Sequence, residues 1–139
     1  MRDIKFRAWD CKTKLFGTVV ELSYSPISKL IYVPSYVRVH DYKDMTHVTH
    51  YSDPDYIQDK LVIEQYTGLH DKNGKEIYES DIVALTDNSY MDEDIQHERV
   101  YYNEKSEWVA GKIYLSKVYF NVEVIGNIHE NKELLEGEQ

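Results

Sequence analysis

Apolar and polar residues alternate along much of this chain with the two-residue period of β-strands. Alternate apolar positions predict an opening strand over residues 4–9, and residues 15–20 predict a second one. Two short β-type runs, 30–33 and 36–39, flank Pro34. Because proline cannot donate to a ladder of hydrogen bonds, we do not expect one unbroken central strand there.

The segment from residue 40 to residue 60 is polar and predicts a long, partly ordered excursion. Within it, Asp53-Pro54-Asp55-Tyr56 is suited to begin a single helical turn, because Asp is a common N-cap and Pro a common first helical residue. The excursion therefore separates an N-terminal group of strands from a C-terminal one.

The clearest strand–turn–strand pattern lies in residues 65–83, where two runs of alternating apolar and polar residues flank Asn73-Gly74. Asn-Gly between such runs is the strongest short-range signal for a β-hairpin, since both residues tolerate the positive φ that a type I′ turn or a bulged relative requires. Residues 61–66 predict the strand that leads into this hairpin. A polar corner at 79–81 then precedes a strand over 81–85.

Further β-type runs follow residues 86–97, and a hairpin loop over 103–106 separates the first two of them. These runs predict strands over 98–102, 107–110, 112–115 and 118–125. Residues 131–135 predict a short helical turn with Asn131 as its N-cap.

Closely spaced strands with short turns predict a mainly β, antiparallel fold. We expect a small SH3-like barrel in the C-terminal half, an N-terminal β segment and a short C-terminal helical turn. The chain of 139 residues fits a single domain, 1–139, with the N-terminal segment and excursion over about 1–60 and the barrel-like part over about 61–135.

Composition favours a cytosolic protein. Cys11 is the only cysteine, so no disulfide forms within the chain. The first residues lack the apolar stretch of a signal peptide, and no apolar run approaches the roughly 20 residues of a membrane span.

The net charge and the aromatic content indicate which class of molecule the protein could bind. The formal net charge of −9 disfavours a protein that tracks nucleic-acid phosphates. Thirteen tyrosines against three phenylalanines favour antiparallel strands with one wet face. Tyrosine is also enriched at interfaces, so these rings either cover ordinary β-surface or contact a partner.

Three segments, 2–10, 65–83 and 123–135, together resemble the YopX protein family of phages and prophages, in the same order and over nearly the whole chain. The resemblance implies a phage-derived, β-rich cytoplasmic protein and brings no catalytic residue. Ser80 stands where the family usually has glycine, so either the corner is strained or it differs here. We interpret the signature residues as fold determinants: Gly68, Asp71, Asn73, Gly74, Tyr78, Asp81, Gly126 and Asn127.

Two groups of residues are candidates for metal binding. Asp44, His47 and His50 carry ligand types that suit zinc or another divalent metal, although surface histidines in a polar excursion are the alternative. An acidic segment, residues 87–94, is either a weak cation site or a solvated loop.

Lys5, Arg7, Trp9 and Lys12 are the candidate nucleic-acid contacts, because basic and aromatic side chains together bind phosphates and stack bases. An ordinary amphipathic strand has the same pattern. The sequence contains neither a G-x-S-x-G motif nor a glycine-rich phosphate loop, so we expect no enzyme and no cofactor.

Three functions follow as hypotheses. The first is a non-enzymatic accessory protein that binds another protein or itself. The second is a nucleic-acid-binding accessory of phage replication or regulation. The third, which the sequence supports least, is a metal-dependent enzyme that uses His47 and His50.

Overall fold

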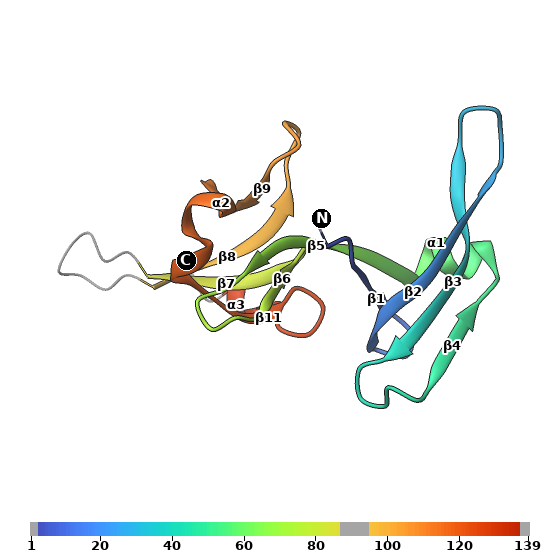
Figure 1. Cartoon of the computed structure of the whole chain (residues 1–139), viewed down its shortest axis with the longest axis horizontal. Helices are drawn as coiled ribbons and strands as arrows, with labels where there is room; N and C mark the ends of the chain where they lie inside the picture. The colour runs from blue at the N-terminus through green and yellow to red at the C-terminus, as the bar shows by residue number, and fades with distance from the viewer. Residues whose placement is uncertain (1–2, 87–94, 137–139) are drawn as a thin grey trace. The chain divides into compact units, whose positions relative to one another are not determined.

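A computed structural model of the chain describes residues 3–86 and 95–136 (Figure 1). It divides into two compact units: an N-terminal unit, Lys5–Gln65, and a C-terminal unit, Met1–Ile4 with Tyr66–Gln139. The boundary falls inside a strand, a few residues after the predicted division near residue 60. Among the described residues, no helix has the length and apolar character needed to cross a membrane.

The N-terminal unit is an antiparallel sheet with one helix. Its strands are β1 (Phe6–Asp10), β2 (Leu15–Pro26), β3 (Tyr32–Asp41), β4 (Val48–Tyr51) and the first half of β5 (Leu61–His70), in the spatial order β4-β3-β2-β1-β5. The second half of β5 belongs to the C-terminal unit and pairs with β6 (Glu76–Tyr78). The core of the N-terminal unit is formed by Ala8, Val37, Val39, Ile57 and Leu61.

Helix α1 (Pro54–Lys60) confirms the predicted helical turn and extends it. The Asp53 carboxylate accepts a hydrogen bond from the Asp55 amide at 3.0 Å, and Pro54 occupies the first turn. Ile57 is buried in the core, so the capped turn is anchored by packing as well as by its N-cap. The excursion is therefore more ordered than expected, with β4 and α1 in it.

Pro34 lies inside β3, where we did not expect an unbroken strand. Two features make the position tolerable. The pairing of β3 with β2 shifts register beside Pro34, and β4 pairs with β3 only over Val37–His40. Pro34 therefore sits at a bulge with one side of its strand unpaired, which is where a sheet accepts proline.

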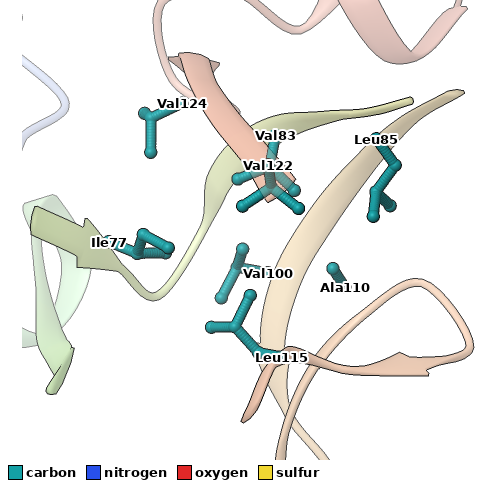
Figure 2. Close-up of a cluster of buried hydrophobic side chains, with 8 residues drawn as sticks. All are labelled: Ile77, Val83, Leu85, Val100, Ala110, Leu115, Val122 and Val124. Atoms are coloured by element: carbon teal, nitrogen blue, oxygen red, sulfur yellow. The ribbon is translucent and has the colours of Figure 1, made fainter. Parts of the chain in front are cut away.

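The C-terminal unit contains a five-stranded antiparallel sheet in the order β10-β9-β8-β7-β11. Its elements are β6, β7 (Asp81–Thr86), β8 (Ile95–Tyr102), β9 (Trp108–Ala110), β10 (Ile113–Tyr114), α2 (Leu115–Val118), the 3₁₀ turn η1 (Tyr119–Asn121), β11 (Val122–Asn127) and α3 (Glu133–Glu136). Figure 2 shows the core side chains pointing toward one another from six of these elements: Ile77, Val83, Leu85, Val100, Ala110, Leu115, Val122 and Val124.

The prediction of a mainly β, antiparallel fold is confirmed. The C-terminal part, for which we expected a small SH3-like barrel, does not form a closed barrel in the described residues. Over the residues that the structure describes, the five-stranded sheet is open, with β10 and β11 at its two edges. Part of the cause is that residues 115–121 are helical rather than extended. Leu115 is buried and Val118 packs against the same core, and a helical turn places such an i, i+3 pair on one face.

Asp71 organises the central hairpin. One carboxylate oxygen, Oδ1, accepts hydrogen bonds from the amides of Asn73 and Lys75, both at 2.9 Å. Gly74 has φ of +85°, while Asn73 is not in the left-handed region, so the turn corresponds to the bulged alternative rather than to type I′. The turn is thus held by its own carboxylate.

The corner after β6 needs a left-handed residue, and Ser80 supplies it with φ of +70°. Asp81 closes the corner, because its Oδ2 accepts a hydrogen bond from the Tyr78 amide at 2.7 Å. Ser80 also bonds through its backbone to Val100 and Ile128. Of the two readings of Ser80, the strained corner is therefore the one observed.

The turn after β11 explains two more signature residues. The Asn127 side-chain oxygen accepts from the amides of His129 and Glu130, each at 3.0 Å. A Cβ at Gly126 would overlap the side chain of Asn131. This turn therefore requires both a small residue and a side-chain acceptor.

Candidate binding groove

A tight loop joins β8 to β9 and fixes the register of the two strands. The Asn103 side-chain oxygen accepts hydrogen bonds from the amides of Lys105, at 3.0 Å, and Glu107, at 2.9 Å. Ser106 adopts φ of +63° and donates its amide to the Asn103 carbonyl. The loop is the one predicted over 103–106, and it places Trp108 directly opposite Tyr102.

Three residues form a row across the outer face of this part of the sheet. Val109 on β9 pairs in register with Tyr101 on β8 and with Tyr114 on β10. Val109 is buried, whereas the two tyrosines remain 39% and 40% exposed. The tyrosine rings thus flank a small apolar floor and keep much of their own surface in solvent.

The hydroxyl of Tyr101 is used to hold the next turn. It donates a hydrogen bond to the Gly111 carbonyl at 3.1 Å. Gly111 has φ of +62°, and a Cβ there would overlap the Glu98 side chain. The turn between β9 and β10 is therefore held close to Tyr101, which orients the ring on its strand.

Tyr102 and Trp108 form a second aromatic pair on the opposite face of the two strands. Their ring centroids lie 4.8 Å apart in a tilted arrangement. Tyr102 is half exposed, and Trp108 packs against the core of the unit. A cross-strand aromatic pair of this kind stabilises the end of the hairpin and leaves one ring available.

Most of these residues, but not Trp108, line a hollow of about 580 Å³, which we call the aromatic groove. Its lining comprises Tyr101, Tyr102, Asn103, Glu104, Lys105, Glu107, Val109, Gly111, Lys112 and Tyr114. Two further hollows adjoin it: one shares Tyr101, Tyr102 and Gly111, and the other shares Glu107 and Tyr114. The concave surface therefore continues around the end of β8, β9 and β10.

The charges on the lining balance. The lining contains two lysines, Lys105 and Lys112, and two glutamates, Glu104 and Glu107. Beside the groove, the Lys117 ammonium lies 5.7 Å from the centroid of the Tyr114 ring, a cation–π distance. The groove therefore combines aromatic surface with charges of both signs, and positive charge is not in excess among its lining residues.

The four candidate nucleic-acid residues do not share one exposed surface. Lys5 and Lys12 are exposed, but Arg7 and Trp9 are buried. The Arg7 Nε lies 2.9 Å from Oε1 of the buried Glu64, and its guanidinium lies 4.7 Å from the Phe16 ring centroid. Sequence alternation could not reveal this, because it depends on β1 lying between β2 and β5.

The candidate metal ligands are likewise not assembled into a site. Within residues 3–86 and 95–136, no three His, Cys, Asp or Glu side chains are placed to hold a metal ion. The Asp44 carboxylate accepts from the Thr46 amide, and His50 Nδ1 lies 2.6 Å from the Tyr36 hydroxyl. Residues 87–94, the candidate cation loop, lie outside the described residues.

Asp10 is a heavily bonded carboxylate of the N-terminal unit that the sequence patterns did not indicate. It accepts from the hydroxyls of Tyr56, at 2.8 Å, and Tyr51, at 3.0 Å, and from the amides of Lys12 and Thr13. Burial alone would raise the pKa of Asp10, but these donors hold it below the usual value. Both oxygens are occupied, so this cluster is a structural cross-link between β1, β4 and α1.

The family follows from comparison with known proteins. A family model described as YopX protein matches residues 5–136. The chain belongs to the YopX protein family. The match includes both units of the structure, so the family pattern is not confined to the central hairpin.

One similar solved structure is the crystal structure of protein EF1440 from Enterococcus faecalis. It is 26% identical, with a TM-score of 0.59, over 97% of this chain and 99% of that chain. The comparison with curated proteins gives no match. The similarity to EF1440 thus extends over both units.

Proposed function

We propose that this YopX-family chain is a non-enzymatic phage or prophage accessory protein of the bacterial cytoplasm that acts by binding another protein. The aromatic groove is the binding site, and an extended polypeptide segment is its ligand. The observation that carries the proposal is the hollow of about 580 Å³ with a buried Val109 floor and tyrosine walls. Pockets that bind small ligands commonly have this size.

A polypeptide suits both the walls and the edge of the groove. Tyrosine rings offer apolar area with a hydroxyl for hydrogen bonding, and tyrosine is enriched in protein interfaces. Strand β10, which contributes Tyr114, stands at the edge of the five-stranded sheet. An extended peptide can pair with such an edge while its side chains enter the neighbouring hollows.

Charge favours polypeptide over nucleic acid. The balanced charges of the lining lack the excess of lysine and arginine that phosphate backbones require. Base stacking on Tyr102 is the specific feature that keeps nucleic acid as the second candidate. In that case, binding would be salt-sensitive and would need Lys105 or Lys112.

The lining does not favour catalysis. It contains tyrosine, lysine and glutamate, but among its residues, all of them described, there is no cysteine, serine or histidine. The lining therefore lacks the Ser–His or Cys–His pair of common nucleophilic enzymes. Recognition rather than bond cleavage is the chemistry that these side chains support.

Selection from a displayed library of random peptides tests the proposal on the full chain. We expect enriched peptides whose dissociation constants rise at least tenfold with Tyr102→Ala or Tyr114→Ala, since a buried aromatic contact contributes more than about 1.4 kcal/mol. Tyr119→Ala is the matched control, because Tyr119 is exposed in the same unit but does not line the groove. No enrichment, equal loss in the control, or tight binding of a single-stranded oligonucleotide instead would overturn it.

A further inference from the structure

The β2–β3 hairpin extends beyond the strands on either side of it (Figure 1). Strand β1 pairs with β2 only over Leu15–Thr18, and β4 pairs with β3 only over Val37–His40. Residues 20–36, which we call the arm, therefore form a two-stranded ribbon whose outer edges pair with no other strand in the described part of the chain.

One face of the arm is apolar. Tyr24 pairs with Pro34 and Pro26 pairs with Tyr32, in line with the Leu22–Val37 pair nearer the core. Val37 is fully buried, and Leu22 packs against the core of the N-terminal unit. The apolar face is thus an outward continuation of the core that no other element of this unit covers.

The arm also carries serines that bond to one another. The Ser25 hydroxyl donates to the Ser35 hydroxyl at 2.7 Å, and the Ser35 hydroxyl lies 3.4 Å from the Ser23 carbonyl. The ribbon is therefore amphipathic, with polar groups satisfied within it and apolar groups presented outward.

The exposed apolar area is large for a single chain. Tyr24, Ile27, Leu30, Ile31 and Tyr32 are each more than half exposed, with Leu30 at 93%. With Val20 added, and with roughly 150–200 Å² for each fully exposed side chain, the arm offers about 550–750 Å². This sum covers both strands and the turn of the arm, and it compares with about 300–600 Å² for the largest contiguous apolar patch of a typical monomer. An isolated two-stranded ribbon is also only marginally stable in water, so covering it stabilises its fold.

The charge of the arm identifies what fits it. Among residues 20–36 the charged ones are Glu21 and Lys29, which cancel, whereas the whole chain has a net charge of −9. A neutral surface offers no attraction to phosphate backbones or anionic lipids. Two copies of an acidic chain repel each other least where net charge is absent, and the same neutral apolar face is present on each copy.

We propose that the arm is a self-association surface on which the arm of a second copy of this chain packs, face to face. The contact is isologous, so each apolar residue meets the equivalent face of the other copy. Together the two arms can bury at most about 1,100–1,500 Å², which reaches the lower part of the range for stable interfaces. This inference concerns the N-terminal unit and does not depend on the aromatic groove.

Sedimentation equilibrium of the full chain over a range of concentrations tests the proposal. We expect a reversible dimer, and a dissociation constant at least tenfold higher for Leu30→Ser combined with Ile31→Ser. The control is Phe120→Ser, because Phe120 is 67% exposed in the C-terminal unit and lies outside the arm. Circular dichroism and thermal melting show that each variant is folded.

A cross-linking experiment decides the question independently of that double variant. In a Cys11→Ser background, Leu30→Cys should be joined between copies by a short bismaleimide, whereas Phe120→Cys should not. A monomer at all concentrations, a dimer that the arm variants leave unchanged, or equal cross-linking at both positions would overturn the proposal. Peptide binding at the groove is not measured in either experiment, so the two proposals succeed or fail separately.

Discussion

The carboxylate of Asp71 accepts a hydrogen bond from the backbone amide of Val124, 2.9 Å away, and so ties the central hairpin to β11. Asp71 and Val124 are 53 residues apart in the sequence. The other carboxylate oxygen of Asp71 accepts hydrogen bonds from the hairpin, so this side chain stabilises both the local turn and the sheet.

Replacing Asp71 should destabilise the protein. We expect Asp71→Ala to lower the free energy of unfolding by about 2–4 kcal/mol, because buried amides lose a charged acceptor. Asp71→Asn keeps the shape and one acceptor oxygen, and should lose less. Urea denaturation of both variants measures this, and a loss below about 1 kcal/mol for the alanine variant would contradict the role of Asp71.

Replacing Ser80 with glycine should stabilise the protein. Ser80 is held at φ of +70°, a region that costs a non-glycine residue about 1 kcal/mol or more. Glycine relieves that strain but adds freedom to the unfolded chain, so we expect a net gain of about 0.5–1 kcal/mol in unfolding free energy. Ser106→Gly should give a gain of the same sign, because Ser106 has a similar φ of +63°. Destabilisation by Ser80→Gly would show that the corner is not strained.

Acid should weaken the N-terminal unit through Asp10. Burial would raise the pKa of Asp10, but the hydrogen bonds from Tyr56, Lys12, Thr13 and Tyr51 outweigh it and hold the folded pKa below the unfolded value of 3.8. The stabilisation is therefore present above the unfolded pKa and is lost as pH falls through the folded pKa. Unfolding free energy should decline from about pH 5 downward, and this decline should be shallower in Asp10→Asn. An unchanged acid profile in that variant would contradict the prediction.

High pH should destabilise the same cluster by ionising the Tyr56 hydroxyl. Burial and the Asp10 carboxylate raise the pKa of Tyr56 from 10.0 to about 12. Stabilisation from this hydroxyl is therefore full below the unfolded pKa of 10.0 and is lost as pH rises through about 12. Ultraviolet titration of tyrosinate should lose one late-ionising group in Tyr56→Phe, with Tyr24→Phe, at an exposed position, as the control.

Replacing Arg7 should destabilise the folded protein, and not only weaken nucleic-acid binding. Arg7→Ala takes the guanidinium partner from Glu64, which is 1% exposed, and breaking such a buried pair costs about 3–5 kcal/mol. The double variant Arg7→Met with Glu64→Leu should recover much of that loss. A stable Arg7→Ala protein that has lost only nucleic-acid binding would contradict this assignment and revive the sequence-based hypothesis for Arg7.

Local signals in the sequence were sufficient for much of the fold. Asp53 with Pro54 indicated α1, the 103–106 loop was placed correctly, and the Asn73-Gly74 turn forms in its bulged version. Each of these depends on hydrogen bonds within a few residues. Local conformational propensity and turn-forming residues are therefore sufficient to predict these elements.

The features that could not be predicted depend on contacts between residues far apart in the sequence. The run Val118-Tyr119-Phe120 has strand-like composition, yet packing of Leu115 on the core makes the region helical. The aromatic groove exists because three strands align Tyr101, Val109 and Tyr114, a register that no single strand encodes. The excess of tyrosine was visible in the sequence, but the grouping of particular rings was not.

The most direct test of the proposed function is to map a selected peptide onto the isotope-labelled full chain by NMR titration. The account predicts that amide shifts concentrate over residues 101–114, around the walls and floor of the aromatic groove, and disappear with Tyr102→Ala. Shifts that concentrate in the N-terminal unit, or that are unchanged in Tyr102→Ala, would contradict it.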